Sequence, residues 1–335
     1  MRAQPACALR STSRSVLARR VRLRGVRSSA FLLAVGALAP LALGACARET
    51  APKPRLAPYS ELALLDVRTK RVRILLSRRG TRVVDGPSWS PDGRRIVFVS
   101  RPCASCVPSL ATISLRTGVV RTLVVRGLGA GDAVSGRTAW SPDGRRILFV
   151  VTTPSGESEV WLVRSNGRRA RQVGGDDALA PAWSPDGKVI SYSAEVHELH
   201  RIYEISPAGG RPRLITTNGS SDQPAFSRDG RTIAFSRIGS SVTWDVCLLD
   251  RQTHAVRCIA NTMAIERDPA WEPNGRRLVL TSDRAGGTIG ARSLYFVASR
   301  GSDLLRLTGP EADASSPAWS PDGRTIVFVR RPILG

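Results

Sequence analysis

The sequence predicts an all-β fold, a six-bladed β-propeller built from four-stranded antiparallel blades. Two observations lead to this prediction. One thirteen-residue phrase recurs six times along the chain, and a looser apolar hairpin lies between its copies. The aromatic residue of the phrase returns after 51, 43, 43, 45 and 48 residues. A period of this length that holds two hairpins, and therefore four strands, is typical of a propeller blade.

The recurring phrase reads Pro-Ala-Trp-Ser-Pro-Asp-Gly-Arg in its last copy, which begins at residue 317. It predicts a tight hairpin turn, because Pro presets φ and Gly accepts the positive φ that such turns require. A strand rich in β-branched and aromatic residues follows, as in 96–99. The aromatic residue of each copy is expected to be the structural repeat of the fold: Trp89, Trp140, Trp183, Phe226, Trp271 and Trp319.

A second and less regular hairpin supplies the two outer strands of each blade. Its copies span 62–76, 112–123, 160–173, 202–215, 246–259 and 294–307. The propeller sequence therefore begins with two outer strands and ends with two inner ones. We expect a composite last blade, whose strands a and b come from the C-terminus and whose strands c and d come from the N-terminus. Such closure removes a seam that would leave strand edges unpaired.

The N-terminus is expected to be an export signal. It carries eight Arg, no acidic residue and an apolar run at 31–43, which is shorter than the ~20 residues that a membrane-spanning helix needs. The run is followed by Gly44-Ala45-Cys46, which resembles the bacterial lipobox, so we expect Cys46 to be lipidated. An ordinary signal peptide that ends near a cysteine is the alternative. The expected domains are a lipoprotein signal peptide at 1–45, a lipid-anchored linker at 46–61 and the propeller at 62–335.

The chain is strongly basic. Its net charge of +23 falls to about +15 without the signal peptide, since Lys and Arg decrease from 50 to 42 while the 27 acidic residues remain. Many of these arginines lie in the predicted a–b turns, which makes one face of the propeller basic. Aromatic residues are not interleaved with them, and export would separate the chain from nucleic acid. We therefore expect no nucleic-acid binding, and a basic face that suits an anionic envelope surface.

Four cysteines belong to the expected propeller. Cys247 and Cys258 lie on the two arms of one outer hairpin, and a four-residue loop would place them opposite each other, within disulfide range. Cys103 and Cys106 form a Cys-x-x-Cys in the loop between strands b and c of their blade. A local disulfide is expected there, and a redox pair or half of a metal site are the alternatives. Disulfides would indicate an oxidising compartment.

The sequence contains few signs of catalysis. His197 and His200 are three residues apart, and on a strand they would point to opposite faces, so an exposed pair in a surface loop is expected and a metal site is the alternative. The sequence has no Gly-x-Ser-x-Gly nucleophile motif and no predicted helix that could follow a phosphate-binding loop. These observations favour a protein that is not an enzyme.

An aspartate recurs shortly before the innermost strand of each blade. Because innermost strands line the central channel, these carboxylates are predicted to ring its mouth and to bind a cationic peptide segment or a calcium ion. The alternative is that each one caps its own turn. The residues are Asp85, Asp132, Asp177, Asp222, Asp268 and Asp313. The longer irregular loops are expected on the same face, at 101–110, 151–159, 194–201, 237–244 and 283–292.

The Trp-Ser-Pro-Asp-Gly phrase resembles the repeat of TolB-type propellers, the PD40 or WD40-like repeat. TolB is the periplasmic partner of the Tol–Pal envelope system, and non-catalytic propellers of prolyl-oligopeptidase-like proteins carry the same repeat. The resemblance covers about 270 residues. About fifteen residues separate Cys46 from the first strand, so the N-terminal α/β domain of TolB does not fit there. The resemblance implies the propeller, and a fold alone does not carry a function.

Together these features predict a non-catalytic, exported lipoprotein, anchored outside the cytoplasmic membrane or in the periplasmic envelope. As a monomer, it would bind an envelope protein or peptide through its loops and channel mouth, with no cofactor other than the calcium considered above. The alternative is a small propeller enzyme, either lactonase-like or acting on sugars or peptidoglycan. A deep pocket with convergent polar groups would favour the enzyme, and a broad shallow surface would favour the scaffold.

Overall fold

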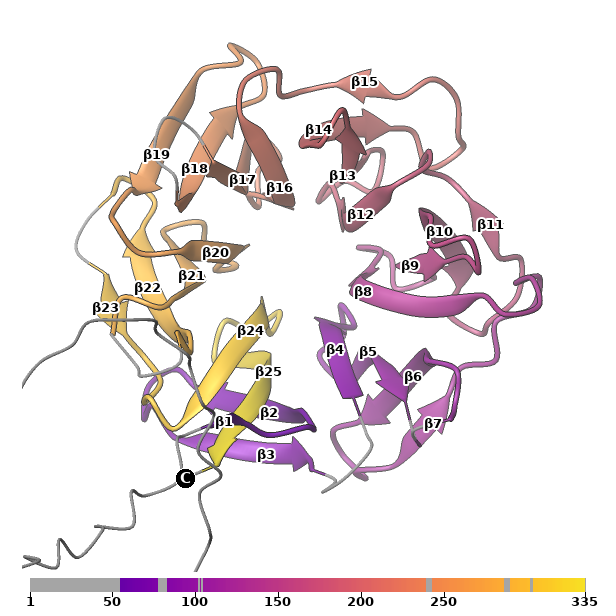
Figure 1. Cartoon of the computed structure of the whole chain (residues 1–335), viewed down its shortest axis with the longest axis horizontal. Coiled ribbons are helices and arrows are strands. Elements are labelled where there is room, and N and C mark those ends of the chain that lie inside the picture. The colour runs from indigo at the N-terminus through magenta and orange to yellow at the C-terminus, as the bar shows by residue number, and fades with distance from the viewer. Residues whose placement is uncertain are drawn as a thin grey trace, which may run out of the picture. The chain divides into compact units, whose positions relative to one another are not determined.

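The computed structural model describes residues 55–77, 83–101, 103, 105–238, 243–285, 290–301 and 304–334. These residues form six four-stranded antiparallel blades around a central channel, which confirms the predicted propeller (Figure 1). Within them, no helix is long and apolar enough to cross a membrane. The predicted signal peptide and Cys46 lie outside the described residues.

We number the blades by their innermost strands, so that β4 begins blade 1 and β24 begins blade 6. The innermost strands, a, are β4 (Val83–Trp89), β8 (Ala133–Trp140), β12 (Ala178–Trp183), β16 (Ser220–Phe226), β20 (Glu266–Trp271) and β24 (Ala312–Trp319). The b strands are β5 (Arg95–Arg101), β9 (Arg146–Thr152), β13 (Ile190–Val196), β17 (Thr232–Ile238), β21 (Arg277–Ser282) and β25 (Thr325–Leu334).

The outer strands follow in the same blade order. The c strands are β6 (Ser109–Ser114), β10 (Ser158–Arg164), β14 (Leu199–Ile205), β18 (Trp244–Asp250), β22 (Ser293–Ala298) and β2 (Glu61–Asp66). The d strands are β7 (Val120–Thr122), β11 (Arg171–Gln172), β15 (Arg213–Leu214), β19 (Val256–Ala260), β23 (Leu305–Arg306) and β3 (Val72–Leu76). The a–b and c–d turns share one face of the ring, the turn face, and the b–c and d–a connections share the other, the loop face.

Blade 6 is composite, as the order of the hairpins predicts. β2 pairs with β25 from Glu61 opposite Arg330 to Asp66 opposite Thr325, so residues from the two ends of the chain form one sheet. The Arg330 guanidinium also donates to Glu61 Oε2 at 2.5 Å. The short strand β1 (Arg55–Leu56) pairs with the end of β25 and brings the ends of the propeller side by side (Figure 1).

The Ser-Pro-Asp-Gly phrase forms the a–b turn through one repeated network. In blade 1, Ser90 Oγ donates to Asp92 Oδ1 at 2.5 Å and accepts from the backbone N–H of Arg95 at 2.9 Å. Asp92 Oδ1 also accepts from the backbone N–H of Arg94, and Gly93 takes a φ of +67°. The same Ser-to-Asp bond recurs in blades 2, 3, 4 and 6. The turn is therefore stabilised by its own side chains.

The repeated Trp joins neighbouring blades. Trp183 Nε1 donates to the carbonyl of Ala139 in the preceding blade at 3.2 Å, and three other repeat Trp make the equivalent bond. Trp140 is the exception, because its buried Nε1 has no partner among the described residues. The guanidinium of Arg146 lies 4.9 Å from the centre of the Trp183 ring. Some arginines that sequence analysis assigned to a basic face therefore stack between blades instead.

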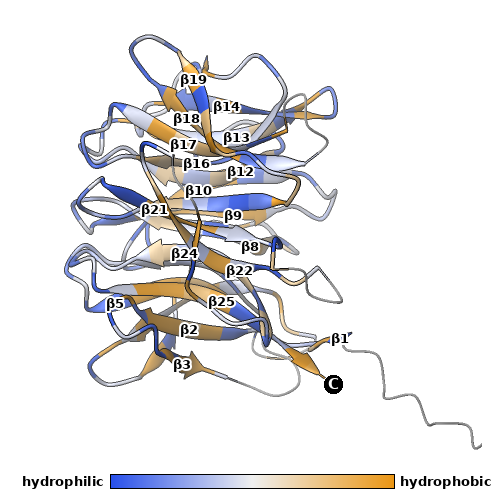
Figure 2. Cartoon of the chain, turned by 90° about the vertical axis from the view of Figure 1, so that its left-hand side faces the viewer, coloured by the Kyte–Doolittle hydropathy of each residue, from blue (hydrophilic) through white to orange (hydrophobic). Residues whose placement is uncertain are grey.

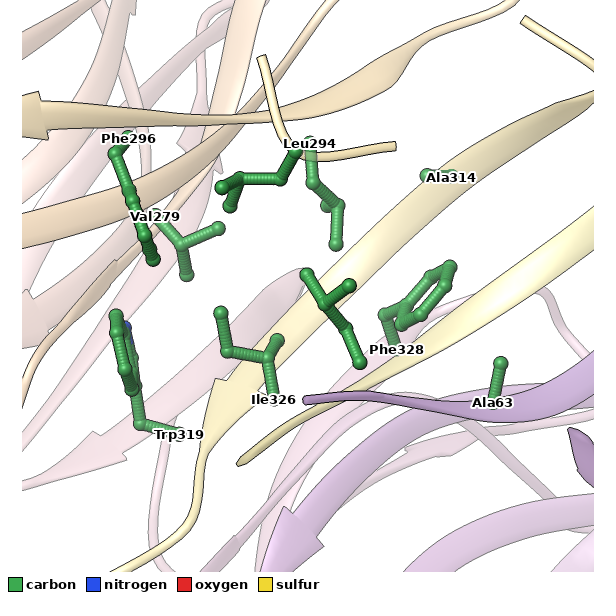
Figure 3. Close-up of a cluster of buried hydrophobic side chains, with 10 residues drawn as sticks. Ala63, Val279, Leu294, Phe296, Ala314, Trp319, Ile326 and Phe328 are labelled. Atoms are coloured by element: carbon green, nitrogen blue, oxygen red, sulfur yellow. The ribbon is translucent and has the colours of Figure 1, made fainter. Parts of the chain in front are cut away.

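The hydrophobic core lies between blades. Figure 3 shows one cluster in which Val279, Leu294 and Phe296 of blade 5 face Trp319 and Phe328 of blade 6. The Phe296 and Trp319 rings stack with centroids 5.4 Å apart. Hydrophobic residues follow the strands, while hydrophilic residues gather in the connections at the two faces (Figure 2). Burial of such rings is the main stabilising contribution to a propeller of this kind.

Both predicted cysteine pairs are disulfides. Cys247 and Cys258 are direct cross-strand partners in β18 and β19, in the predicted register. Cys103 and Cys106 close a local loop.

The predicted irregular loop at 194–201 is instead a tight hairpin. Val196 pairs with Leu199 across a two-residue turn of His197 and Glu198, whose φ values are +51° and +63°. His200 lies on β14 rather than in a loop, with Nε2 4.0 Å from Glu195 Oε2. Two consecutive left-handed residues match the twist of the flanking strands, which explains why no longer loop is needed.

Candidate binding site in the central channel

The channel wall carries a bulge in every innermost strand. In each of the six described a strands the pairing with strand b breaks its register three or four residues before the repeated aromatic residue. One residue at each break has a left-handed backbone: Gly86, Gly136, Ala180, Gln223, Asp268 and Ser316. Bulges re-aim side chains, and left-handed non-glycine residues concentrate at functional sites. The six bulges thus form a ring around the channel in which the backbone direction of each innermost strand changes.

An ion pair crosses the channel at this ring. Arg137 NH2 of blade 2 lies 2.7 Å from Asp268 Oδ1 of blade 5, and these two blades are opposite each other (Figure 1). Both side chains are largely removed from solvent, with exposed fractions of 18% and 4%. The Arg137 side chain therefore extends across the channel at the level of the bulges.

Asp268 is held by several donors besides Arg137. Gln223 Nε2 donates to Oδ1 at 2.7 Å and Thr281 Oγ1 donates to Oδ2 at 3.2 Å, while Arg292 NH1 lies 3.9 Å from Oδ2. Burial by itself would raise the pKa of Asp268, but the charges of the nearby arginines, first Arg137 and then Arg292, hold that pKa below its usual value. Asp268 is therefore a buried carboxylate that stays ionised.

Two further aspartates continue this polar belt. Asp222 accepts from Ser193 Oγ at 2.6 Å and from Arg267 NH2 at 2.9 Å, which links blades 3, 4 and 5. Asp313 accepts from the backbone and the guanidinium of Arg292, with N–O distances of 2.9 to 3.2 Å. We use the name polar belt for Asp85, Arg137, Asp222, Gln223, Arg267, Asp268, Arg292 and Asp313.

Asp85 differs from the other carboxylates of the belt. It accepts from the backbone N–H of Gly86 at 2.7 Å and from Ser316 Oγ at 3.3 Å. Burial raises the pKa of Asp85, and the nearby charge of Asp268 raises it further. Asp85 is thus protonated more easily than an ordinary aspartate.

The sequence pattern predicts all six aspartates before strand a, and the structure corrects this. Asp85, Asp222, Asp268 and Asp313 lie within β4, β16, β20 and β24 and join the polar belt. Asp132 precedes β8 and accepts from the backbone N–H of Gly129 at 2.6 Å, so it caps its own turn. Asp177 precedes β12 as an exposed residue with a φ of +54°. The variable length of the d–a connection explains why sequence position alone grouped all six.

The expected open ring of acids is therefore a belt of paired charges. Three of its four aspartates pair with Arg137, Arg267 and Arg292, which the sequence pattern did not single out. They carry no local signal, because their partners lie 21 to 131 residues away in other strands. Among the described residues, no group of three or more His, Cys, Asp or Glu is arranged to hold a metal ion.

A cavity of about 360 Å³ lies on the turn-face side of Arg137. All six blades contribute to its wall, mainly with the proline and small residues that precede the repeated aromatic residue, such as Pro181, Ala182 and Pro224. Such side chains offer contact surface and no acid–base chemistry. The lining of this cavity therefore suits contact with a partner.

The comparisons with known proteins agree with this fold. The family described as PD40, TolB beta propeller domain, matches residues 48–243 and 218–332. The Tol-Pal system protein TolB of Anaeromyxobacter dehalogenans is 29% identical over 119 residues, which are 36% of this chain and 25% of that protein. The match thus spans about a quarter of the length of this curated relative.

Two solved structures show the range of similar propellers. A putative TolB from Agrobacterium tumefaciens aligns with a TM-score of 0.69 at 21% identity, over 83% of this chain and 99% of that one. An oligogalacturonate lyase from Vibrio parahaemolyticus aligns with a TM-score of 0.56 at 12% identity, over 82% and 83%. At these identities the likeness shows the fold alone, and it includes both a TolB and an enzyme.

Proposed function

Because the chain belongs to the TolB beta propeller (PD40) family, we propose that it is an exported scaffold that binds an envelope protein or peptide at the loop-face mouth of its channel. The Tol-Pal relative supports a partner in the cell envelope. The two disulfides support an oxidising compartment outside the cytoplasm. Lipidation of Cys46 would tether the monomeric propeller to a membrane through the linker at 46–61.

The polar belt is the observation that carries this proposal. Its ion pair between Arg137 and Asp268 bars the channel, so a partner engages the mouth and does not pass through. The belt holds four carboxylates and three guanidinium groups, and this small acidic excess favours a segment that carries Lys or Arg. Asp222, Asp268 and Asp313 are paired with arginines, which suits recognition better than proton transfer.

The test is capture of partners from detergent-solubilised envelope with the lipidated chain as bait and Cys46→Ala as the unanchored control. A double variant, Asp85→Asn with Asp313→Asn, removes two belt charges while keeping the shape of both side chains. Asp132→Asn with Asp177→Asn is the matched control, because it removes the same charge outside the belt. We expect a stoichiometric protein partner that the belt variant loses and the control variant keeps.

Equal capture by both double variants, with thermal unfolding unchanged, would exclude the belt as the binding site. If no protein is captured and the purified chain instead turns over a lactone or an oligosaccharide, the small propeller enzyme becomes the better assignment. The lyase of similar fold supplies the reason to include that assay.

A further inference from the structure

A second cavity, none of whose lining residues belongs to the polar belt, lies between blades 3 and 4. We call it the 3–4 groove. It has a volume of about 430 Å³, within the range of small-molecule sites. The chain that leaves β15 forms one wall through Ile215, and blade 4 forms the other through Phe235 and Leu249. These three side chains are buried and apolar. The groove therefore has an apolar wall against which the apolar part of a ligand can pack.

The loop-face end of the groove is polar. Ser221 and Arg237 both line it, and they are direct cross-strand partners in β16 and β17, so their side chains lie on the same side of the sheet. Ser221 is fully buried. Neither Ser221 Oγ nor Arg237 Nε has a hydrogen-bond partner among the residues that the structure describes. Buried donors without partners are rare and costly, which points to an acceptor supplied by a ligand.

The residue of blade 6 that corresponds to Arg237 is Arg330, and it has a carboxylate partner. Arg330 lies eleven residues after the repeated aromatic residue, as Arg237 does, and it is bonded to Glu61 at 2.5 Å. In blade 4 the cross-strand partner of Arg237 is Asp245, which does not line the groove, and no ion pair of 4.0 Å or less joins these two described residues. Arg237 is therefore the arginine that lines the polar end of the groove.

The packing between blades 3 and 4 also explains why the groove exists. The apolar cluster there has five buried members in the described ranges, against seven to ten in each of the other five clusters. The cross-strand positions of Ser221 and Arg237 are filled by Val134 and Val151 in blade 2 and by Ala178 and Ala194 in blade 3. In blade 4 a hydroxyl and a guanidinium, whose Nε has no partner among the described residues, thus replace core volume.

We propose that the 3–4 groove binds a small organic monocarboxylate with an aliphatic or aryl body. The carboxylate accepts from Arg237 Nε and Ser221 Oγ, and the apolar body packs against Ile215, Phe235 and Leu249. A guanidinium and a hydroxyl supply the charge-assisted bonds that a single carboxylate needs. This site is independent of the channel and of the partner proposed to bind there.

Calorimetric titration of the purified chain with octanoate and 4-phenylbutyrate tests the proposal, with 1-octanol as the uncharged probe of matched length. We expect saturable one-to-one binding of at least one carboxylate. Arg237→Met keeps the apolar stem and should weaken that binding by at least about tenfold, because it removes a charge-assisted bond. Arg168→Met, an exposed arginine in blade 2, is the matched control and should bind as the parent chain does.

Ser221→Ala keeps the test decisive if Arg237→Met fails to fold. Since Ser221 Oγ has no partner among the described residues, the substitution should leave the melting temperature unchanged or raise it, and still weaken octanoate binding. Absence of carboxylate binding to the parent chain, equal binding of 1-octanol, or unchanged binding in both groove variants would each overturn the proposal. Envelope capture by Arg237→Met stays normal if the channel proposal holds, so the two proposals fail separately.

Discussion

At the scale of single residues, the Arg137 side chain links two opposite blades, 2 and 5, which share no strand pairing. Its partner Asp268 also makes two bonds with Gln223. Gln223 Nε2 donates to Asp268 Oδ1 at 2.7 Å, and the backbone N–H of Asp268 donates to Gln223 Oε1 at 3.0 Å. A buried carboxylate that loses one of its cations keeps its desolvation cost. The ion pair between Arg137 and Asp268 itself adds little stability, but removing Arg137 would leave Asp268 buried with an uncompensated charge.

We predict that Arg137→Met destabilises the propeller by about 2–3 kcal/mol, because Asp268 stays buried with fewer donors. Urea unfolding measures the change. Combining Arg137→Met with Asp268→Asn should recover about half of the loss, since the uncompensated charge disappears. If the double variant is less stable than Arg137→Met alone, Asp268 does not depend on Arg137.

The repeat Trp offer a built-in comparison. Trp183→Phe removes the indole bond to the Ala139 carbonyl and should lower the free energy of unfolding by about 1 kcal/mol beyond the loss of ring size. Trp140→Phe suffers the same loss of ring size, but its Nε1 has no partner among the described residues. The difference between the two variants in urea unfolding therefore isolates the hydrogen bond. Equal losses would mean that the bond between blades contributes nothing.

At the scale of the element, the a–b hairpins were predictable and the channel bulges were not. The Ser-Pro-Asp-Gly turn has its chemistry within four residues, so composition reveals it. The left-handed bulge residue is Gly, Ala, Gln, Asp or Ser in different blades, because strand pairing imposes its conformation. Asp268 and Gln223 therefore carried no common pattern. The ion pairs of the belt depend on which blades are opposite, which only the closed ring decides.

The repeated turns predict a pH dependence of stability. The Ser hydroxyl of each turn is the first cause that lowers the pKa of its aspartate: Asp92, Asp143, Asp186, Asp229 and Asp322. A folded pKa below the unfolded value of about 3.9 contributes stability at neutral pH, and this is lost as pH falls through that value toward the folded pKa. Urea midpoints should therefore fall between about pH 5 and pH 3.

The control for this pH effect exists in the chain itself. Blade 5 carries Asn274 at the aspartate position, and its Oδ1 still accepts from the backbone N–H of Arg276 at 2.8 Å. Asp143→Asn with Asp322→Asn should therefore fold and flatten the acid limb of the profile. Asp85 acts with the opposite sign, because its raised pKa contributes stability at low pH that is lost as pH rises. An unchanged acid limb in the double variant would exclude the turns as its cause.

The two disulfides should differ in their effect on stability. The Cys247–Cys258 bond closes an eleven-residue separation across paired strands, so Cys258→Ser should cost about 2–3 kcal/mol in the chain-entropy account. Cys103 and Cys106 are three residues apart, and Cys106→Ser should cost clearly less. Melting temperatures of the two variants under oxidising conditions give the comparison. A larger loss for Cys106→Ser would show that its loop supports the fold.

At the scale of the whole molecule, the composite blade closes the ring with backbone hydrogen bonds. Other blades meet their neighbours mainly through side chains, including the Trp indole bonds and ion pairs such as Arg251 with Glu204. Isolated backbone bonds, such as the one from the Ala314 N–H to the Arg292 carbonyl, add to these contacts. Blade 6 alone, within the described residues, joins the two ends of the propeller in one sheet. Strand pairing in blade 6 should therefore stabilise the closed ring more than the side-chain contacts between the other blades do.

Circular permutation tests this role directly, because Arg55 and Leu334 are strand partners and a short glycine linker can join these ends. A permutant opened in the b–c turn of blade 2, at residues 155–156, again has a composite blade made from both ends. A permutant opened between blades 2 and 3, at residues 175–176, has whole blades at both ends and a seam without strand pairing. We predict that the first keeps a urea midpoint near that of the parent chain and that the second unfolds at clearly lower urea. Equal midpoints would mean that interdigitated side chains between blades are sufficient to close the ring.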